Sequence, residues 1–467
     1  MKKIINIIIS VIGIILSIIC FKFVLDMGIV PNKYLIMLGV LLLVLNILGT
    51  LFLFLKGIVF KIFGVIIYII ILVLSILGIK YSKNTKDFID KSFGNSKDIA
   101  VYDVVVLKNS DYKDIYDLEG KTISYYNNEK TDYLDLLKEK VSIELKENSL
   151  FNLYDSLANN ETDAIVLNDS ILYMLEGLNK EIKDNIEIIY SYDVVVETEQ
   201  KEYIKNNLKP INIYISGSDS RGDKIVTNSL SDVNMIMSID PIEHQMLLTS
   251  IPRDYYVKLH GTTGINDKLT HAGMYGLDMS RKTLEDLFGI DIDYSIKVNM
   301  ASVVKMVDLV GGIDIYSDTE FDSYHIKGWH VIKGINHMDG AKALAYSRER
   351  YAYADGDNHR VRNQQQVLEA VFEKLSTDKN LLLKYDELLS SFSELYVTDI
   401  PSELISLIIN NQLDGLKKWT IERQSVTGYS AMKETYSMPG WTLYVMEPNT
   451  KSVNAAKEKI EELLKLN

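Results

Sequence analysis

The chain has 467 residues, with 63 acidic and 50 basic side chains and a formal net charge of −13 at pH 7. A protein that binds a nucleic-acid duplex needs a basic face, so this balance argues against a nucleic-acid partner. One compact domain seldom holds this many residues, which predicts several domains. The chain's one cysteine, Cys20, lies in an apolar run, so the rest of the chain has no thiol, which suits an extracytoplasmic face.

Three apolar runs within residues 1–86 predict three transmembrane helices. They cover residues 4–25, 34–55 and 62–79, and each is long enough to cross a hydrocarbon core of about 30 Å. A cleaved signal peptide is the alternative for the first run, but no small-residue cleavage site follows Cys20 and two more runs come after it. The flanking lysines are tied at four on each side, so charge leaves the orientation undecided. Three spans place the long C-terminal part on the opposite side of the membrane from Met1.

The segment 97–205 alternates short β-rich runs with helical patterns, which predicts a small α/β domain with a partly parallel sheet. The β-rich runs are 101–107, 122–126, 164–167, 186–190 and 194–196. Residues 117–121 and 160–166 resemble short sequence segments of solute-binding-protein-like domains. Because no polar set converges in this segment, an accessory structural or protein-contact module is the favoured interpretation.

Arginine is confined to the part of the chain after residue 220. All eight arginines lie there, seven of them between Arg221 and Arg362, whereas the 42 lysines are spread over the whole length. A guanidinium can grip a phosphate or carboxylate with two parallel hydrogen bonds, which an ammonium cannot do. We therefore expect an anionic ligand to bind the arginine-bearing segment.

Three predicted strands, at residues 211–216, 235–239 and 245–250, place Asp219, Asp232 and Arg253 near their ends. The ends of strands in α/β sheets are where such folds usually bind ligands. If the strands are neighbours, two carboxylates able to hold a hard divalent cation lie beside a cation that binds phosphate. The alternative is that each aspartate caps a turn and that Arg253 bridges to Asp254.

A helix over residues 361–375 is predicted by its apolar spacing, and it begins near Arg360 with Gln364 one turn later. A helix N-terminus attracts anions, so both side chains would reinforce an anion site; a solvated helix end is the alternative. The chain lacks the motifs of serine hydrolases, P-loop NTPases and common zinc peptidases. The seven histidines are interpreted as surface or turn residues, six of them without an acidic partner at metal-binding spacing.

Several motifs in fixed order resemble those of the LytR-CpsA-Psr family, and their sequences are most similar to its capsule-associated CpsA branch. The resemblance covers about residues 208–467, and an accessory α/β domain before it also resembles that branch. The matching motifs are Gly217-Ser218-Asp219-Ser220-Arg221, Ser231-Asp232, Pro252-Arg253-Asp254, Asp267-Lys268-Leu269-Thr270-His271-Ala272, Val310-Gly311-Gly312-Ile313-Asp314, Ala345-Tyr346-Ser347-Arg348-Glu349-Arg350 and Arg360-Val361-Arg362-Asn363-Gln364-Gln365.

The resemblance implies a phosphotransferase of Gram-positive bacteria, anchored in the cell membrane by several passes and acting on its outer side. Such proteins move a glycopolymer, for example teichoic acid or capsule, from a polyprenyl-pyrophosphate carrier to peptidoglycan with the help of Mg²⁺, which Mn²⁺ can replace. By motif position, Asp219 and Asp232 would hold the metal. The pyrophosphate would be bound by Arg253, Arg348, Arg350, Arg360 and Gln364, with Lys268 and Asp357 completing the pocket; the catalytic set would be Arg253, Asp219, Asp232, Arg348 and Arg350.

The implied fold is an α/β catalytic domain at 208–467, with a central mixed β-sheet between helical layers. That sheet is expected to include a strand at residues 443–446, and a final helix is expected from Ser452. Two departures stand out. Many members have Arg-Ser-Asp-Thr around the second carboxylate where this chain has Leu230-Ser231-Asp232-Val233, and Asn363 stands where a second arginine is common.

Two other functions remain open at this point. A non-enzymatic regulator or sensor could hold polyprenyl phosphates in the same arginine-lined pocket, although two carboxylates would hinder phosphate binding unless a metal bridges them. A hydrolase would use the same pocket with water as the acceptor, releasing polymer from the carrier. A pyrophosphate gathers charge at the leaving group as its P–O bond breaks, which suits a site of arginines and aspartates without a nucleophilic side chain.

Overall fold

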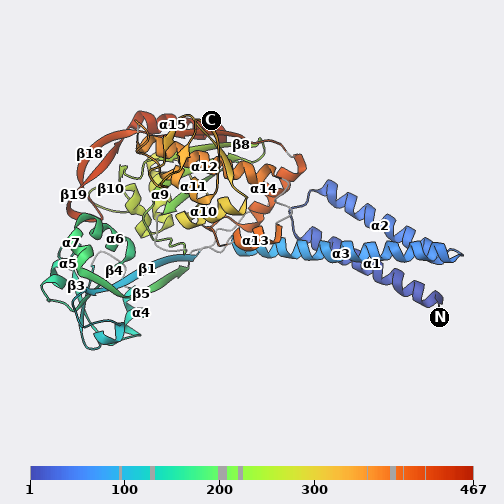
Figure 1. Cartoon of the computed structure of the whole chain (residues 1–467), viewed down its shortest axis with the longest axis horizontal. Coiled ribbons are helices and arrows are strands. Elements are labelled where there is room, and N and C mark those ends of the chain that lie inside the picture. The colour runs from blue at the N-terminus through green and yellow to red at the C-terminus, as the bar shows by residue number, and fades with distance from the viewer. Residues whose placement is uncertain are drawn as a thin grey trace.

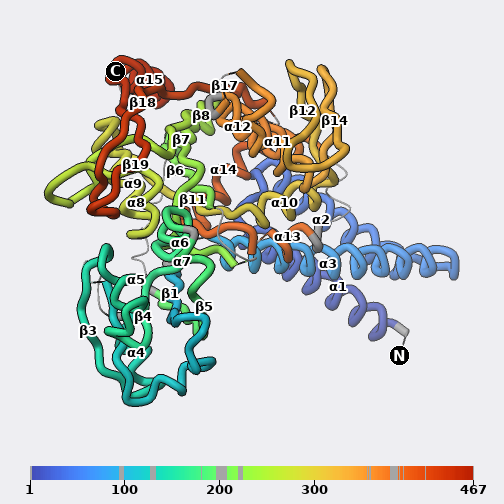
Figure 2. Tube along the Cα trace, turned by 60° about the vertical axis from the view of Figure 1, so that its left-hand side comes forward, coloured from blue at the N-terminus to red at the C-terminus, as the bar shows by residue number. Residues whose placement is uncertain are grey.

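The computed structural model describes residues 2–93, 97–126, 132–197, 208–218, 224–354, 356–378, 385–392, 394–415 and 417–465. Three parts follow one another along the chain (Figures 1 and 2): a group of long apolar helices, a small unit around a five-stranded sheet, and a larger unit around a six-stranded sheet.

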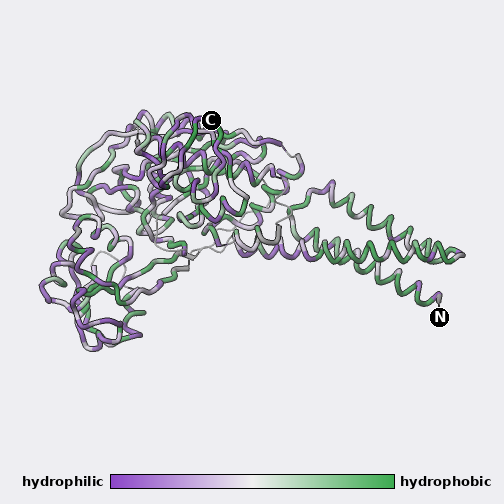
Figure 3. The backbone as a smooth tube through the Cα atoms, in the orientation of Figure 1, coloured by the Kyte–Doolittle hydropathy of each residue, from purple (hydrophilic) through white to green (hydrophobic). Residues whose placement is uncertain are grey.

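The N-terminal helices are α1 (Lys2–Asp26), α2 (Asn32–Phe54) and α3 (Ile58–Ser92). All three are long and apolar enough to cross a membrane, as the three predicted runs require, and Figure 3 shows them as the most hydrophobic part of the molecule. Glycines allow close packing, since a Cβ on Gly49 would lie 2.9 Å from the Tyr68 ring. The polar end of α3 continues beyond the predicted run and packs against α13 (Tyr385–Phe392) and α14 (Ser402–Gly415) of the larger unit.

The small unit is built on a sheet with strand order β3-β2-β4-β1-β5. The pairs β2–β3 and β2–β4 are parallel and β1 pairs antiparallel with β4 and β5, which confirms a partly parallel sheet. The two β-rich runs after residue 185 form one strand, β5, which pairs with β1 along its length. Its elements are β1 (Lys97–Leu107), η1 (Ile115–Leu118), β2 (Thr122–Tyr126), α4 (Asp132–Lys138), β3 (Glu144–Asn148), α5 (Leu150–Ala158), β4 (Ala164–Asn168), α6 (Asp169–Leu178), α7 (Lys180–Asn185) and β5 (Ile186–Glu197).

The larger unit has a mixed sheet with strand order β16-β11-β6-β7-β8-β17. Strand β6 is parallel to β11, β8 is parallel to β17, and β7 runs antiparallel between β6 and β8. The strands are β6 (Ile211–Ser218), β7 (Val233–Asp240), β8 (Gln245–Ile251), β11 (Tyr294–Asn299), β16 (Val397–Thr398) and β17 (Thr420–Ser425).

Helices cover both faces of this sheet, as the sequence predicts. On one face, Tyr214 and Ile236 pack against Leu284 of α9 (Leu277–Phe288) and Ile460 of α15 (Thr450–Leu464). On the other face, the strands pack against α14 and against α12 (Asp357–Thr377). The remaining elements are β9 (Tyr256–Val257), β10 (Asp267–Lys268), α8 (Leu269–Ala272), η2 (Gly273–Tyr275), α10 (Met300–Leu309), β12 (Ile313–Ser317), β13 (Phe321–Asp322), β14 (His330–Val331), β15 (Gly334–Met338) and α11 (Gly340–Arg348).

One strand prediction is wrong. Residues 443–446 belong to β19 (Met438–Pro448), which forms a separate two-stranded sheet with β18 (Gly428–Thr435). The edge of the central sheet is occupied instead by β17, which alternates polar and apolar residues weakly and was not recognised as a strand. The predicted final helix is present as α15.

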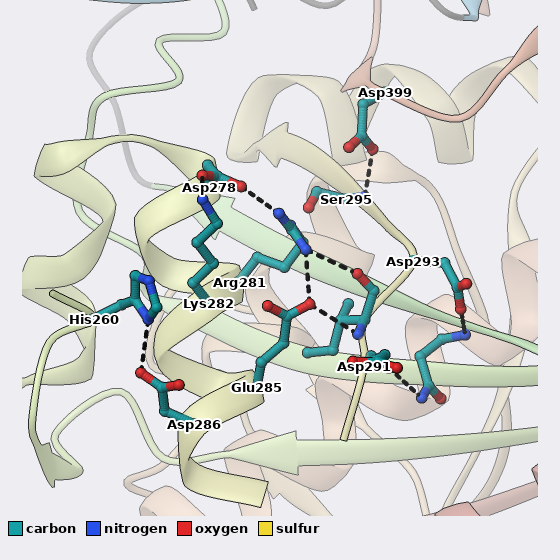
Figure 4. Close-up of polar contacts among 12 residues, drawn as sticks. His260, Asp278, Arg281, Lys282, Glu285, Asp286, Asp291, Asp293, Ser295 and Asp399 are labelled. Atoms are coloured by element: carbon teal, nitrogen blue, oxygen red, sulfur yellow. Dashed lines mark hydrogen bonds and ion pairs between the residues drawn. The ribbon is translucent and has the colours of Figure 1, made fainter. Parts of the chain in front are cut away.

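The N-terminal half of α9 is joined to the loop before β11 by a buried arginine (Figure 4). The Arg281 guanidinium donates to Glu285 at 2.7 Å and to the carbonyl oxygen of Ile292 at 3.0 Å, and it also contacts Asp278. This arginine therefore has a structural task and lies outside the predicted anion site.

Candidate active site

The candidate site lies at one edge of the six-stranded sheet, where the parallel strands β6, β8 and β11 end. Asp232 directly precedes β7 and donates its backbone N–H to the Gly217 carbonyl oxygen at 2.8 Å. A side chain at Gly217 would place its Cβ 2.9 Å from the Val233 Cβ, so glycine is what allows this close approach. Arg253 follows the end of β8 by two residues. Neighbouring strands thus bring Asp232 and Arg253 together, as predicted.

Opposite charges alternate along this edge. The Arg253 Nη1 donates to Asp232 Oδ1 at 2.6 Å, and its Nε lies 3.8 Å from Asp254 Oδ2. The other Asp254 oxygen pairs with the Lys268 ammonium. The Arg253 side chain remains 34% exposed and Asp232 20% exposed, so a ligand's anionic group can reach the guanidinium. The contact with Asp254 agrees with the predicted alternative in which Arg253 bridges to that residue, and the exposed part of the guanidinium leaves the predicted phosphate-binding role open.

A buried polar network fixes the segment that carries Asp232. The Tyr214 hydroxyl donates to Asn234 Oδ1 at 2.6 Å, and Ser231 Oγ lies 2.6 Å from Ser216 Oγ. Burial raises the pKa of Tyr214, so its phenol stays protonated and remains a donor. Because buried polar groups that are fully hydrogen-bonded hold one geometry, the segment carrying Asp232 is fixed against the sheet.

Lys268 is held by a second buried cluster around Asp267. Asp267 Oδ1 accepts the backbone N–H of Lys268 at 2.7 Å and lies 2.6 Å from Nδ1 of His271. Asp267 Oδ2 accepts the backbone N–H of Ser437 at 2.9 Å. The segment is tied to Arg253, whose carbonyl oxygen accepts the N–H of Thr270 at 2.8 Å.

The interpretation of all histidines as surface or turn residues is therefore wrong. His271 is 3% exposed and lies against Asp267, and His359 is buried in α12; His244 is buried too, but it lies in a turn, as the interpretation allows. Asp267 lies in β10 and His271 in α8, so the pair is not an i, i+4 pair within one helix, and helical periodicity in the sequence does not reveal it.

Arg348 and Arg350 lie on either side of Glu349 at the end of α11, and both are exposed. The buried Glu349 carboxylate accepts the backbone N–H groups of Tyr324 and Tyr351, at 2.9 and 3.0 Å. Arg350 donates to the Tyr351 hydroxyl at 2.7 Å, with its guanidinium 4.8 Å from the centre of that ring. The turn is thus fixed by Glu349 while both guanidinium groups face outward.

Helix α12 carries Arg360 and Gln364 one turn apart, and both are partly exposed. It begins at Asp357, three residues before the predicted start. The next residue, Gln365, is buried and donates to the carbonyl oxygens of Leu248 and Gln424 at 3.2 and 2.7 Å. Gln365 therefore fixes α12 across the neighbouring strands β8 and β17.

The structure joins Asp232, Arg253 and Lys268 by direct contacts through Asp254. Arg348 is the last residue of α11 and Arg350 follows two residues later, whereas Arg360 and Gln364 lie on the neighbouring helix α12. Asp219 lies outside the described residues, and so does the side chain of Asp357. Asp254, Asp267 and Glu349, which position the predicted cations, were not recognised as site residues from the sequence.

The donor chemistry of the site fits a hard divalent cation, although no group of three or more His, Cys, Asp or Glu suited to a metal occurs in the described part of the chain. Mg²⁺ is usually bound by one or two carboxylates together with substrate phosphates, rather than by an all-protein cage. Asp232 supplies such a carboxylate at the sheet edge.

Comparisons with known proteins place this chain in a family. The model of the LytR_cpsA_psr family matches residues 176–461. A polyisoprenyl-teichoic acid--peptidoglycan teichoic acid transferase, TagU, of Enterococcus faecalis is 29% identical over 239 residues, which is 51% of this chain and 74% of that protein. The protein of the same name from Bacillus anthracis is 34% identical over 210 residues, which is 45% of this chain and 67% of that protein.

Solved structures include the crystal structure of B. subtilis TagV, which is 28% identical and covers 56% of this chain and 99% of that chain, with a TM-score of 0.46. The family match spans more than half of the present chain and contains every candidate site residue described above. The chain therefore belongs to the LytR_cpsA_psr family.

Proposed function

We propose that this protein is a membrane-anchored phosphotransferase that moves a glycopolymer from a polyprenyl-pyrophosphate carrier to peptidoglycan, making a phosphodiester bond. The observation that carries the proposal is the Asp232–Arg253 pair at the sheet edge, 2.6 Å apart and partly exposed. It combines a carboxylate of the kind that binds a metal with a guanidinium of the kind that binds phosphate. Relatives 29% and 34% identical carry the name of teichoic acid transferases.

The reaction breaks one P–O bond and makes another. A hydroxyl oxygen of peptidoglycan attacks the phosphorus that carries the glycan and loses its proton to water. The bridging P–O bond then breaks, and polyprenyl monophosphate leaves with the electron pair. Arg253 would neutralise charge on the pyrophosphate, and Asp254, whose carboxylate contacts both cations, would keep Lys268 beside it. Fixed cations of this kind stabilise charge that develops in the transition state.

The other predicted residues are assigned by the same chemistry. Arg348, Arg350, Arg360 and Gln364 would surround the pyrophosphate from the α11 and α12 side, with Asp357 at the start of α12. A Mg²⁺ ion, replaceable by Mn²⁺, would be held by Asp232 together with Asp219. When bound, the metal would supply positive charge to the phosphate oxygens. The glycan can be teichoic acid, capsule or another wall polymer.

The three apolar N-terminal helices support an anchor in the membrane, where the lipid-linked donor would be confined. We assign residues 1–86 to the anchor, 97–205 to the accessory domain and 208–467 to the catalytic domain, with both domains outside the cell membrane. A tethered enzyme meets a membrane-bound donor at a high effective concentration.

The test is product analysis with full-length protein in vesicles containing a polyprenyl-pyrophosphate-linked glycan, with peptidoglycan added, in water enriched in ¹⁸O. Transfer predicts metal-dependent polyprenyl monophosphate and a glycan phosphate on peptidoglycan without ¹⁸O. Free glycan phosphate that contains ¹⁸O would instead show hydrolysis. Tight donor binding without either product, with metal and acceptor present, would establish a sensor.

A further inference from the structure

The segment of residues 224–232, which leads into the candidate site, is bound on one side by the small unit. That unit contributes β1 and β5, which pair along their full length and extend toward the larger unit (Figure 2); we call this pair the ribbon. The segment ends at Asp232, the carboxylate that pairs with Arg253. A contact between the ribbon and this segment therefore connects the small unit with the site.

Thr227 makes that contact both as a hydrogen-bond donor and as an acceptor. Its backbone N–H donates to the Ile99 carbonyl oxygen at 3.0 Å, and its Oγ1 accepts the backbone N–H of Ile99. The next residue, Asn228, donates its N–H to the same carbonyl oxygen at 3.1 Å. Thr227 is completely buried. Buried backbone groups are costly to leave unpaired, so this arrangement fixes the segment on the ribbon.

Further contacts join the same two parts. The Lys224 ammonium forms an ion pair with Asp193 of β5, at the exposed edge of the contact. Leu230 packs against a buried cluster that both units share, formed by Leu150 and Leu153 of the small unit together with Met274 and Met438 of the larger unit. The segment between Lys224 and Leu230 is thus held to the small unit by backbone hydrogen bonds and an ion pair, and it adjoins the apolar cluster between the two units.

The opposite side of the segment is held by the catalytic sheet. The buried Lys297 ammonium of β11 donates to the Ser229 carbonyl oxygen at 3.1 Å, and Asn299 Nδ2 donates to the Lys224 carbonyl oxygen at 3.1 Å. The Ser231 N–H donates to the Thr270 carbonyl oxygen at 3.1 Å, two residues after Lys268. The segment is therefore clamped between the ribbon and the residues that form the site.

We propose that Thr227 is a positioning residue for the phosphotransfer, through which the small unit sets the position of Asp232; this inference rests on the proposed function. Asp232 lies five positions after Thr227, and every hydrogen bond just described limits the movement of the segment between them. Displacing a catalytic group by about 1 Å can reduce a rate by about 100-fold. The small unit is then a part of the catalytic apparatus, and loosening its ribbon from Thr227 would lower turnover without touching a residue that binds donor.

A second connection reaches the other side of the site. The β18–β19 hairpin packs on the small unit, where the Trp441 and Phe151 rings lie 5.0 Å apart. At its turn, Ser437 donates to Asp267, the carboxylate that holds Lys268. The small unit thus contacts the segment of Asp232 directly and is linked to the segment of Lys268 through this hairpin, which a spacer attached at one point would not do.

The test compares Thr227→Val with Thr227→Ser in the full-length protein. Valine has nearly the same shape but cannot accept the Ile99 N–H, whereas serine can. Thr398→Val is the matched control, because Thr398 is also buried. Its hydroxyl donates to the Ser295 carbonyl oxygen at 2.7 Å and accepts a backbone N–H, just as the Thr227 hydroxyl donates to the Ile99 carbonyl oxygen and accepts the Ile99 N–H. Two readouts are needed: hydrogen exchange of residues 225–234, and kcat and KM for the lipid-linked donor.

We expect Thr227→Val to speed hydrogen exchange in residues 225–234 and to lower kcat about 10-fold or more, with KM within about twofold, the range typical of losing a supporting residue. Thr227→Ser should restore both. The inference would be overturned if hydrogen exchange in Thr227→Val kept the wild-type rate, or if Thr398→Val lost as much kcat as Thr227→Val. If the wild-type protein had no turnover, the proposed function would fail, and unchanged exchange would separately reject the positioning role.

Discussion

Arg253 is the residue on which the proposed chemistry depends most. We expect Arg253→Ala to lower kcat by about 10²–10³, the usual effect of removing one donor that stabilises transition-state charge. Arg253→Lys should recover only part of that loss, because an ammonium cannot bond Asp232 and a phosphate through a planar fork. Initial rates of polyprenyl monophosphate release measure both variants.

The control for this change is Lys282→Ala, which removes a cation from α9 that pairs with Asp278 at 2.7 Å on an exposed helix surface (Figure 4). It should leave kcat within about twofold, since exposed ion pairs contribute little. Equal rates in Arg253→Ala and Lys282→Ala would contradict the site assignment.

At the residue scale, the sequence could identify the charged groups but not their supports. Asp232 and Arg253 could be predicted because each stands next to a strand end, where folds of this kind place ligands. Asp267 was named only as part of a motif, and its partner Ser437 is 170 residues away. No local pattern reports a contact over that separation, so the buried cluster that holds Lys268 became visible only in three dimensions.

Among the elements, α9 depends on its buried arginine. We expect Arg281→Met to reduce the free energy of unfolding by about 2–4 kcal/mol, because it leaves Glu285, 23% exposed, and the Ile292 carbonyl without the guanidinium. Lys282→Met on the same helix should change it by less than about 0.5 kcal/mol. Urea titrations of both variants decide the point, and similar unfolding midpoints would refute the structural role of Arg281.

The turn between β7 and β8 should make stability depend on pH through Asp240. Burial raises the pKa of this carboxyl, but the N–H of Glu243, the Lys465 ammonium and the N–H of Ile242 outweigh burial, so the pKa lies below its usual value. A lowered folded pKa contributes stability above the unfolded pKa of about 4, and that contribution is lost as pH falls through the folded value.

Asp240→Asn should therefore cost about 1–3 kcal/mol near neutral pH and progressively less below about pH 4. Fluorescence of Trp419, whose ring lies 5.2 Å from that of His244 in the same turn, can follow the unfolding. Asp291→Asn, at an exposed carboxyl, is the control. A difference between Asp240→Asn and wild type that stays constant from pH 7 to pH 3 would be inconsistent with this role.

At the element scale, strongly patterned segments were predicted and weakly patterned ones were not. Buried strands such as β6 and β8 are rich in Ile, Leu and Met, so their sequence indicates their place. Residues 443–446 have the same appearance, yet hydrogen bonds to β18 keep them in a hairpin outside the central sheet. The composition of residues 443–446 indicates that a strand forms there. Which strand it pairs with depends on the hairpin turn and on β17, a mostly polar strand that occupies the edge of the central sheet.

For the molecule as a whole, the three apolar helices and the order of the two sheet units follow from the sequence, but the contacts between the units do not. The contact of Thr227 with Ile99 joins residues 128 positions apart. It could not be read from the chain because both lie in segments that look like ordinary strand and loop. The three-dimensional arrangement thus adds a link between the small unit and the site.

The membrane anchor should raise kcat/KM for a donor in vesicles but not for a water-soluble donor. A fragment of residues 80–467 keeps the polar end of α3 that packs on α13 and α14. With a donor in vesicles, we expect its kcat/KM to be at least about 10-fold lower than that of the full-length protein, because tethering raises the effective concentration. With a short-chain, water-soluble donor, the two proteins should be alike. Equal rates on vesicles would rule out a role for the anchor in meeting the donor.

The most direct measurement is the release of polyprenyl monophosphate from a polyprenyl-pyrophosphate-linked glycan, followed by mass spectrometry with peptidoglycan present, for wild type and Arg253→Ala with Mg²⁺ or EDTA. We expect product from wild type with Mg²⁺, at least about 100-fold less from Arg253→Ala, and little with EDTA. Donor bound tightly by wild type, with Mg²⁺ and acceptor present and no polyprenyl monophosphate released, would contradict it.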